Sequence, residues 1–510
     1  MPVLELIRRP PERTGPGSGV VVGLCVLFTL ALRVPFLTWP LMPDEAGLLI
    51  IAQNWEEGPF LYGDFFVGRG IVLLLVFVLA DALGGAIALR LLGCLVAVIL
   101  VVAAGWAGHQ LRGRPGAGWS ALVAASYSST YAMSSGVMNE RLLAAALVTV
   151  SCACTIAAVR HSCSRTGDAL AVLAGACATS ALLVVQSYAE GAVFAGVLLF
   201  ASWRVRALPG SAVVRIASGG LLGMLLPVAA VALGVLVSWL TASQVWFQMF
   251  GYRLQAVGVI GRSDNDFYRF VTLTVIAALT GFLVLLFCFV CGYRQVKRYD
   301  NTATWVAVLA MIVASGAAMF LGGAWYNDYL LQLIPAVVLA TAVMAPQPTW
   351  SGLGMRCGAA MAAVAAVVAT YLGLERPILG STNSQAAVGR WMAADSEQGD
   401  TGVVLWGKAN VLHAAGMSSP YPYLWSLLTR TLDPELDLLL TTLRGPDAPT
   451  WLVEWYPRNS WQLDADGALT AAIEDRYIQV GSPCGIDVYL LKSESRELPS
   501  DAQCEQWRAG

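Results

Sequence analysis

Long apolar segments dominate this sequence, and they restrict the folds that are open to it. Eleven runs are close to the 17–25 residues that a helix needs to cross the hydrocarbon core of a bilayer. They cover 20–39, 86–108, 117–133, 141–159, 168–184, 188–203, 213–241, 270–292, 303–321, 328–345 and 355–373. Only 13% of the 510 residues are charged, whereas a soluble domain has about 25%. The sequence therefore predicts a polytopic α-helical membrane protein.

The distribution of basic residues predicts the orientation of these spans, because arginine and lysine are retained in cytoplasmic loops. With the N-terminus inside, the cytoplasmic connections carry Arg112, Arg114, Arg160, Arg165, Arg204, Arg206, Arg215, Arg294, Lys297, Arg298 and Arg356. The outer connections carry fewer basic residues, namely Arg69, Arg253, Arg262 and Arg269. We therefore expect a multi-pass plasma-membrane protein with a cytoplasmic tail (1–19), a transmembrane domain (20–373) and outer loops at 40–69, 134–140 and 242–269.

The apolar run 70–84 is shorter than the others. Counting it as a full crossing would invert every later loop and destroy the bias in basic residues. We interpret it as a half-inserted or re-entrant helix.

The last part of the chain, 374–510, is soluble in character and is predicted to lie outside the cytoplasm. The segments 403–407 and 450–455, and the later Y-I-Q-V-G and I-D-V-Y-L-L, favour strands. Helical stretches near 385–395 and 424–443 separate them, which indicates a small α/β domain. Cys484 and Cys504 fall in this part, and a disulfide between them is plausible in an oxidising compartment.

An acidic pair, Asp44-Glu45, follows the first span directly. A carboxylate at the bilayer centre costs about 2.5–3.5 kcal/mol, so acids at the membrane edge are either solvated or functional. The segment 44–57 is predicted to be an amphipathic helix in the interface plane, with Leu48 and Trp55 on its apolar face. Its dipole would favour both acids at the N-terminus. Two interpretations of Asp44 remain open, a helix cap and a catalytic carboxylate.

An acidic pair in this position resembles the GT-C superfamily, the membrane glycosyltransferases that use polyprenyl-phosphate sugars. Three further segments are similar to this family, and to its protein mannosyltransferase and lipid A aminoarabinose transferase group in particular. They are Y-G-D-F-F-V-G-R-G (62–70), A-L-R-L-L-G (88–93) and W-Y-N-D-Y-L-L-Q-L-I-P (325–335). Arg69-Gly70 stands where family members often carry Lys-Pro-Pro, so the basic charge remains while the prolines are missing.

The resemblance implies transfer of a sugar from a polyprenyl-phosphate donor to an acceptor hydroxyl on the extracytoplasmic face, with inversion. Asp44 is our candidate for the general base. Glu45 could tune its ionisation or bind an ion or a water. A carboxylate-bound Mg²⁺ or Mn²⁺ stays open as a cofactor. Arginine suits bidentate binding of phosphate oxygens, and the candidates on the outer side are Arg69, Arg253 and Arg262. The alternative for each arginine is contact with membrane lipid headgroups.

Other outer residues are weaker candidates. Glu140 closes the second outer loop and either orients the acceptor, binds an ion or caps the next helix with Asn139. Glu190 lies about one turn inside a span and either faces the cavity or pairs with an outer-loop arginine. Asp64, Tyr326 and Tyr329 are candidates for the cavity or acceptor side. The aromatic residues Trp406, Tyr421, Tyr423 and Trp425 either stack on a sugar acceptor or form an aromatic core.

The composition also excludes some functions and leaves others open. The net charge of −2 and the lack of a basic block argue against a nucleic-acid partner. Of the three histidines, only His413 is predicted to lie outside, which argues against a histidine-containing zinc site beside Asp44. A transporter or flippase of a lipid-linked saccharide, and a non-catalytic scaffold, are the alternative functions. The sugar and the acceptor, whether glycan, lipid or protein, stay unidentified.

Overall fold

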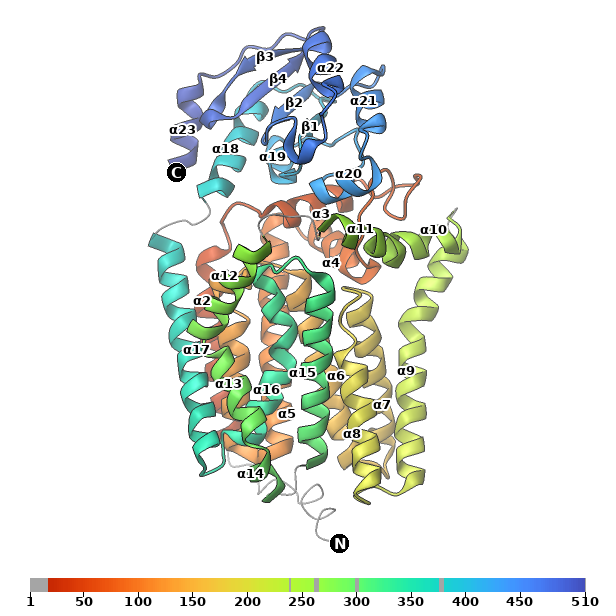
Figure 1. The fold of residues 1–510 in the computed structure, drawn as a ribbon, viewed down its shortest axis with the longest axis vertical. Coiled ribbons are helices and arrows are strands. Elements are labelled where there is room, and N and C mark those ends of the chain that lie inside the picture. Colours follow the sequence, from red (N-terminus) through yellow and green to blue (C-terminus); the bar gives the residue numbers. More distant parts are fainter. Residues whose placement is uncertain (1–16, 238–239, 261–265, 299–301, 376–379, 510) are drawn as a thin grey trace.

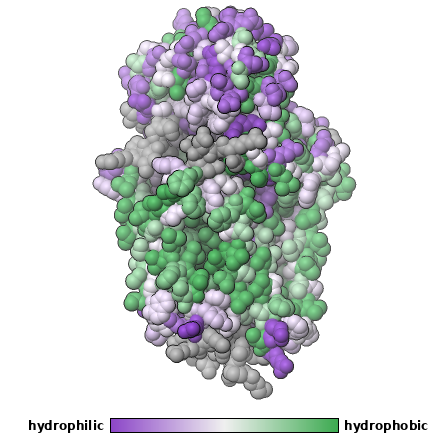
Figure 2. Space-filling model, in the orientation of Figure 1, coloured by the Kyte–Doolittle hydropathy of each residue, from purple (hydrophilic) through white to green (hydrophobic). Residues whose placement is uncertain are grey.

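The computed structural model describes residues 17–237, 240–260, 266–298, 302–375 and 380–509. A bundle of long helices carries a smaller α/β domain on one end (Figure 1). On the face that Figure 2 shows, the bundle carries an apolar band and the α/β domain has a largely hydrophilic surface. This division between an apolar band and a polar cap is what a bilayer and an aqueous compartment require of a membrane protein.

Seven helical segments of the described chain are long and apolar enough to cross a membrane. They comprise α2 (Gly17–Arg33, with η1 Val34–Phe36), α5 (Ala86–Tyr127), α6 (Glu140–Arg160), α9 (Gly210–Val237), α15 (Thr302–Gly322), η4 with α16 (Asn327–Leu333, Ile334–Met344) and α17 (Trp350–Glu375). The pair α12 (Asp266–Leu279) and α13 (Phe282–Cys291) becomes an eighth if it is one span, bent by 73°. The polytopic helical fold is confirmed.

Several of the predicted spans differ from these helices for identifiable reasons. Helix α5 includes two predicted spans, because Arg112 and Gly113 leave helical geometry and the chain reverses there. The hydroxyl of Ser120 donates to the carbonyl of Ala104 at 2.9 Å, which a straight helix would not allow over 16 residues. Helices α7 (Arg165–Leu182) and α8 (Glu190–Arg204) lie among the other bundle helices (Figure 1). The count of eleven spans stays a prediction.

Two other segments also depart from simple spans. The predicted span 270–292 is broken between α12 and α13, where Gly281 adopts a left-handed conformation with φ of 74°. The 12-residue apolar helix α4 (Ile71–Ala82) occupies the predicted re-entrant segment, and it lies near the domain end of the bundle (Figure 1). The α5 reversal and the α8–α9 turn, which carry many of the predicted cytoplasmic arginines, lie at the end opposite the α/β domain (Figure 1).

The α/β domain contains a four-stranded sheet in the order β1-β2-β4-β3. Strand β1 (Gly402–Val404) is parallel to β2 (Trp451–Glu454), while β4 (Asp487–Leu491) is antiparallel to β2 and to β3 (Tyr477–Gly481). All four predicted strands are confirmed. Its helices are α18 (Gly380–Ala393), α19 (Ala409–Ala415), α20 (Ser426–Leu432), α21 (Asp437–Arg444), α22 (Ala468–Arg476) and α23 (Asp501–Ala509). A disulfide joins Cys484 to Cys504 in α23, as the sequence suggested.

The junction between bundle and domain is formed by α3 (Pro43–Gln53), α10 (Ala242–Trp246), η3 (Phe247–Gly251) and α11 (Tyr252–Ile260). The prediction of an amphipathic helix over 44–57 with one polar face is wrong, whereas its position in the membrane interface stays a prediction. Helix α3 ends at Gln53, where the side chain of Asn54 donates to the carbonyl of Ile50 at 2.7 Å. Glu45 to Ile51 are all buried, because α19 of the domain and α4 both pack against this helix.

Candidate active site

Asp44 is the second residue of α3 and is exposed. The capping interpretation is wrong for this residue, because the N-cap position belongs to Met42. Oδ1 of Asp44 instead accepts a hydrogen bond of 2.7 Å from the indole nitrogen of Trp425, which immediately precedes α20. The bundle and the α/β domain therefore meet at this carboxylate.

Glu45 points into the protein interior and is only 2% exposed. Its Oε2 lies 2.8 Å from Nη2 of Arg90 and accepts from the backbone nitrogen of Met42 at 3.0 Å. Its Oε1 accepts from the backbone nitrogen of Met138 at 2.9 Å. Burial raises the pKa of Glu45, while the facing Arg90 opposes this increase. These contacts make Glu45 an anchor that ties the start of α3 to the 137–138 segment.

Two buried arginines support the same loops, and the sequence reasoning missed both. Nη1 of Arg33 donates to the carbonyls of Ser128, at 2.7 Å, and Ser135, and Nη2 donates to that of Val137 at 3.2 Å. Arg90 also donates to the carbonyl of Pro40 at 3.2 Å. An arginine inside an apolar run is costly unless it is paired, and that cost was the signal that could have identified them.

Arg69, Glu140 and Arg253 lie together near the same end of the bundle. Nη1 of Arg69 is 2.6 Å from Oε1 of Glu140, the first residue of α6. Nε of Arg253 donates to the carbonyl of Gly68 at 3.2 Å, next to Arg69. Burial, together with the charge of Arg69, lowers the pKa of Arg253 to about 10, so it still carries its charge at neutral pH. Two neighbouring guanidinium groups with one carboxylate leave an excess of positive charge.

A second ion pair borders this cluster. Nε of Arg141 is 3.1 Å from Oδ2 of Asp328, and its guanidinium lies 3.9 Å above the ring centre of Tyr329. The side chain of Asn139 accepts from the backbone nitrogen of Arg141 at 2.7 Å. Asn139 therefore caps α6, and Glu140 does not. The two ion pairs therefore bring together the start of α6, the 325–329 segment and the 60–70 loop.

Tyr326 connects this cluster to Asp44. The guanidinium of Arg269 lies 4.8 Å from its ring centre. Partial burial raises the pKa of Tyr326, Arg269 opposes this, and the negative charge of Asp44 adds to the increase. An electrostatic effect of this kind requires the groups to be close. Tyr326 and Tyr329, whose ring centres are 6.2 Å apart, thus lie between the cluster and Asp44 at the domain end of the bundle.

Comparison with known proteins identifies the fold. No family model and no curated protein sequence matches the chain. Among solved structures, ArnT from Cupriavidus metallidurans bound to undecaprenyl phosphate aligns with a TM-score of 0.60 and 14% identity, over 92% of this chain and 97% of ArnT. The archaeal oligosaccharyltransferase AglB from Archaeoglobus fulgidus, in complex with an inhibitory peptide and a dolichol-phosphate, aligns with a TM-score of 0.52 and 14% identity. That alignment covers 93% of this chain and 74% of AglB. Both are GT-C proteins. The chain has the GT-C fold.

The remaining predicted site residues lie elsewhere on the GT-C fold or outside the described residues. Asp64 is exposed on the 60–65 turn. Glu190 is 1% exposed, and its Oε1 accepts from Ser315 at 3.0 Å and from Gln332. Of its two predicted roles, this does not match pairing with an outer-loop arginine. Arg262 falls in 261–265, outside the described residues.

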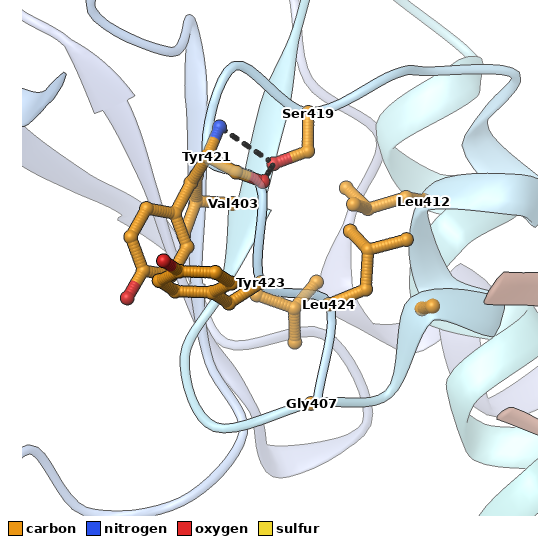
Figure 3. Close-up of a pocket in the computed structure, with 9 residues that line it drawn as sticks. Val403, Gly407, Leu412, Ser419, Tyr421, Tyr423 and Leu424 are labelled. Carbon is orange, nitrogen blue, oxygen red and sulfur yellow. Dashed lines mark hydrogen bonds between the residues drawn. The ribbon is translucent and has the colours of Figure 1, made fainter. Parts of the chain in front are cut away.

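The aromatic residues of the α/β domain divide into two sets. Trp406 and Tyr421 are 5% and 4% exposed and form core, as the second of the two interpretations expected. Tyr421 also lines a small pocket, together with Val403, Leu412, Ser419, Tyr423 and Leu424 (Figure 3). That lining contains no charged group to bind a sugar phosphate. Trp425 is instead half-buried at the junction with the bundle.

The fit of a metal ion can be tested on the donor atoms. Within the described ranges, no three His, Cys, Asp or Glu side chains come together in a way that could bind a metal. Both oxygens of Glu45, the carboxylate next to Asp44 in sequence, are turned to Arg90 and two backbone N–H groups. Asp328 is paired with Arg141. These carboxylates therefore do not form a ligand set with Asp44.

Proposed function

We propose that the protein is a membrane glycosyltransferase that moves a sugar from a polyprenyl-phosphate donor to an acceptor hydroxyl. The observation that supports this most directly is an exposed carboxylate, Asp44 on α3, at the same end of the bundle as the arginine pair of Arg69 and Arg253. The structures of ArnT and AglB that share the fold contain undecaprenyl phosphate and a dolichol-phosphate. The pairing of a base with a cationic phosphate site suits such a donor.

In the proposed reaction, Asp44 removes the proton from the acceptor hydroxyl as its oxygen attacks the anomeric carbon. The new carbon–oxygen bond forms opposite the bond to the donor phosphate, so the configuration inverts. The electron pair of the broken bond leaves with the phosphate, which already is a good leaving group. The proton on Asp44 is then released to water, and the enzyme is ready for another cycle.

Arg69 and Arg253 bind the donor phosphate in this proposal. The positive charge of two guanidinium groups is only partly balanced by Glu140, and a phosphate would complete the balance. The same charges stabilise the phosphate as it takes up the electron pair in the transition state. Glu140 orients Arg69 through the 2.6 Å ion pair.

Glu45 acts in this scheme through structure, as a positioning residue. Its ion pair with Arg90 fixes the first turn of α3, and that turn carries Asp44. We propose no catalytic step through a metal ion. A dependence of the activity on Mg²⁺ or Mn²⁺ stays a prediction. It can be tested by removing divalent ions with a chelator and then adding each ion back.

We also propose that the active site faces the extracytoplasmic side of the plasma membrane. The arginine-rich turns lie at the opposite end of the bundle (Figure 1), as the positive-inside rule requires of cytoplasmic loops. The Cys484–Cys504 disulfide of the α/β domain suits an oxidising compartment. The donor lipid would then reach the site from the outer leaflet.

Deletion of the gene followed by mass spectrometry of envelope glycans and lipids tests the proposal. We expect one sugar to disappear from an acceptor and its polyprenyl-phosphate donor to accumulate in the outer leaflet. Expression of the wild-type gene should restore the sugar and return the donor to its normal level. The control variant Glu57→Gln, which changes an exposed acid of the same outer loop, should do the same. A flippase would instead leave the donor on the cytoplasmic leaflet. A scaffold would leave both levels unchanged.

A further inference from the structure

The α/β domain reaches the reacting region through one short segment, 422–425. The carbonyl of Pro422 accepts from the backbone nitrogen of Phe66 at 3.2 Å. The ring of Tyr423 lies edge-on to the ring of Phe66, with 6.2 Å between the centres. Two residues later, Trp425 donates its indole N–H to Asp44. One segment therefore contacts both the loop that carries Arg69 and the first turn that carries Asp44.

The position of Trp425 is fixed by its surroundings. Its backbone forms the N-cap of α20, with φ of −130° and ψ of 140°, and its carbonyl accepts from the backbone nitrogen of Leu428 at 3.0 Å. Close by, the side chain of Asn410 donates to the carbonyl of Leu41 at 3.2 Å, which attaches α19 to the residues before α3. Trp425 thus belongs to a docked interface, where a hydrogen bond can fix an orientation.

The ring of Trp425 packs directly on α3. A Cβ atom on Gly47 would lie 2.5 Å from Cζ2 of this ring and 3.2 Å from Cβ of Ala409. Gly47 is three residues after Asp44, so the two lie on the same side of the helix. The lack of a side chain at Gly47 is what lets the indole come close enough to bond to the carboxylate.

We propose that Trp425 is a positioning residue, whose indole N–H fixes the carboxylate of Asp44 so that Oδ2 faces the acceptor hydroxyl. This inference rests on the proposed function. An exposed carboxylate rotates freely between orientations, and a base must lie within hydrogen-bond reach of the proton that it removes. A hydrogen bond to Oδ1 selects one orientation and leaves the second oxygen for the acceptor. The active site is then incomplete without the α/β domain.

Trp425→Phe tests the inference, because it keeps a ring and removes only the donor. A hydrogen bond to a charged group is strong enough that its loss should reduce kcat by about 10–100-fold. KM for the donor should stay within about twofold, because the phosphate site is not altered. The matched control is Trp406→Phe, which removes an indole donor bonded to the carbonyl of Pro457 at 3.0 Å in the same domain. This control should keep the wild-type kcat.

Gly47→Ala is an independent test that needs no change in Trp425. Alanine favours helix formation over glycine, so α3 should form as before while the indole is pushed off Asp44. We expect kcat of the folded protein to fall, and the thermal unfolding midpoint to drop slightly because the added methyl group overpacks this contact. If Trp425→Phe and Gly47→Ala both retain the wild-type kcat while Asp44→Asn is inactive, the positioning role is wrong and the proposed function stands. If Asp44→Asn is fully active, the proposed function itself fails.

Discussion

The guanidinium of Arg69 lies 2.6 Å from the carboxylate of Glu140, and this ion pair joins the 60–70 loop to the first residue of α6. Glu140 is 11% exposed and Arg69 is 25% exposed, so the pair is partly shielded from water and orients a cation that is still accessible. Arg253 adds a second cation from α11. Three segments distant in the sequence thus build one region of positive charge at the domain end of the bundle, the end at which Asp44 also lies.

The arginine pair should determine donor affinity. Arg69→Met and Arg253→Met each remove charge-assisted hydrogen bonds to phosphate, and each should weaken undecaprenyl phosphate binding by about 10–100-fold. Isothermal titration of the purified protein in detergent measures this. Arg215→Met is the control. Arg215 is an exposed arginine on α9 that forms an ion pair with Asp168 on α7. Equal affinity in all three variants would place the phosphate elsewhere.

Glu45 and Arg90 should behave as a structural pair. Removing one partner leaves a buried charge uncompensated, so Glu45→Ala and Arg90→Ala should each reduce the free energy of unfolding by about 3–5 kcal/mol. The double variant should lose less than the sum, because the uncompensated charge is gone. Chemical unfolding in detergent gives these values. Additive losses would contradict a direct interaction between the two side chains.

The disulfide should stabilise the α/β domain. Cys484 and Cys504 are 20 residues apart, and closing a loop of that size contributes about 3 kcal/mol. Cys484→Ser should therefore lower the thermal midpoint, and dithiothreitol should have the same effect on the wild type. Cys163→Ser changes an exposed free thiol and serves as the control. A wild-type chain that is fully reduced when isolated from cells would contradict the oxidising location.

Thiol labelling should report the orientation of the bundle. Cys163 is exposed in the turn between α6 and α7, which is predicted to be cytoplasmic. A membrane-impermeant maleimide should therefore label it only after cells are permeabilised. A cysteine introduced by Glu57→Cys, in the outer 40–69 loop, should react in intact cells. Reversal of the two results would invert the proposed topology.

Helices and strands whose formation depends only on neighbouring residues could be predicted from the sequence. The apolar length of a span and the alternation of a strand depend on neighbouring residues alone, and the four strands of the α/β domain were correctly predicted. The bend between α12 and α13 was not, because a glycine in an apolar run is compatible with a straight helix as well. The resemblance of a few motifs also identified the GT-C fold correctly.

The surroundings of Asp44 could not be predicted, because they depend on a partner 381 residues away in the sequence. The amphipathic pattern of 44–57 favoured an interfacial helix, but the packing of α19 and Trp425 covers that surface. The local pattern therefore predicted the helix correctly and missed the burial of Glu45 and of the residues that follow it. The buried arginines Arg33 and Arg90 carried a usable signal in their intramembrane positions.

The most direct measurement of the central claim compares binding with transfer in Asp44→Asn, which keeps the size of the side chain and removes the base. Undecaprenyl phosphate affinity of the purified variant and its ability to restore the missing sugar in the deletion strain would be measured together. The account predicts affinity within about twofold of wild type and no restored sugar at normal expression. Full restoration of the sugar by Asp44→Asn would contradict it.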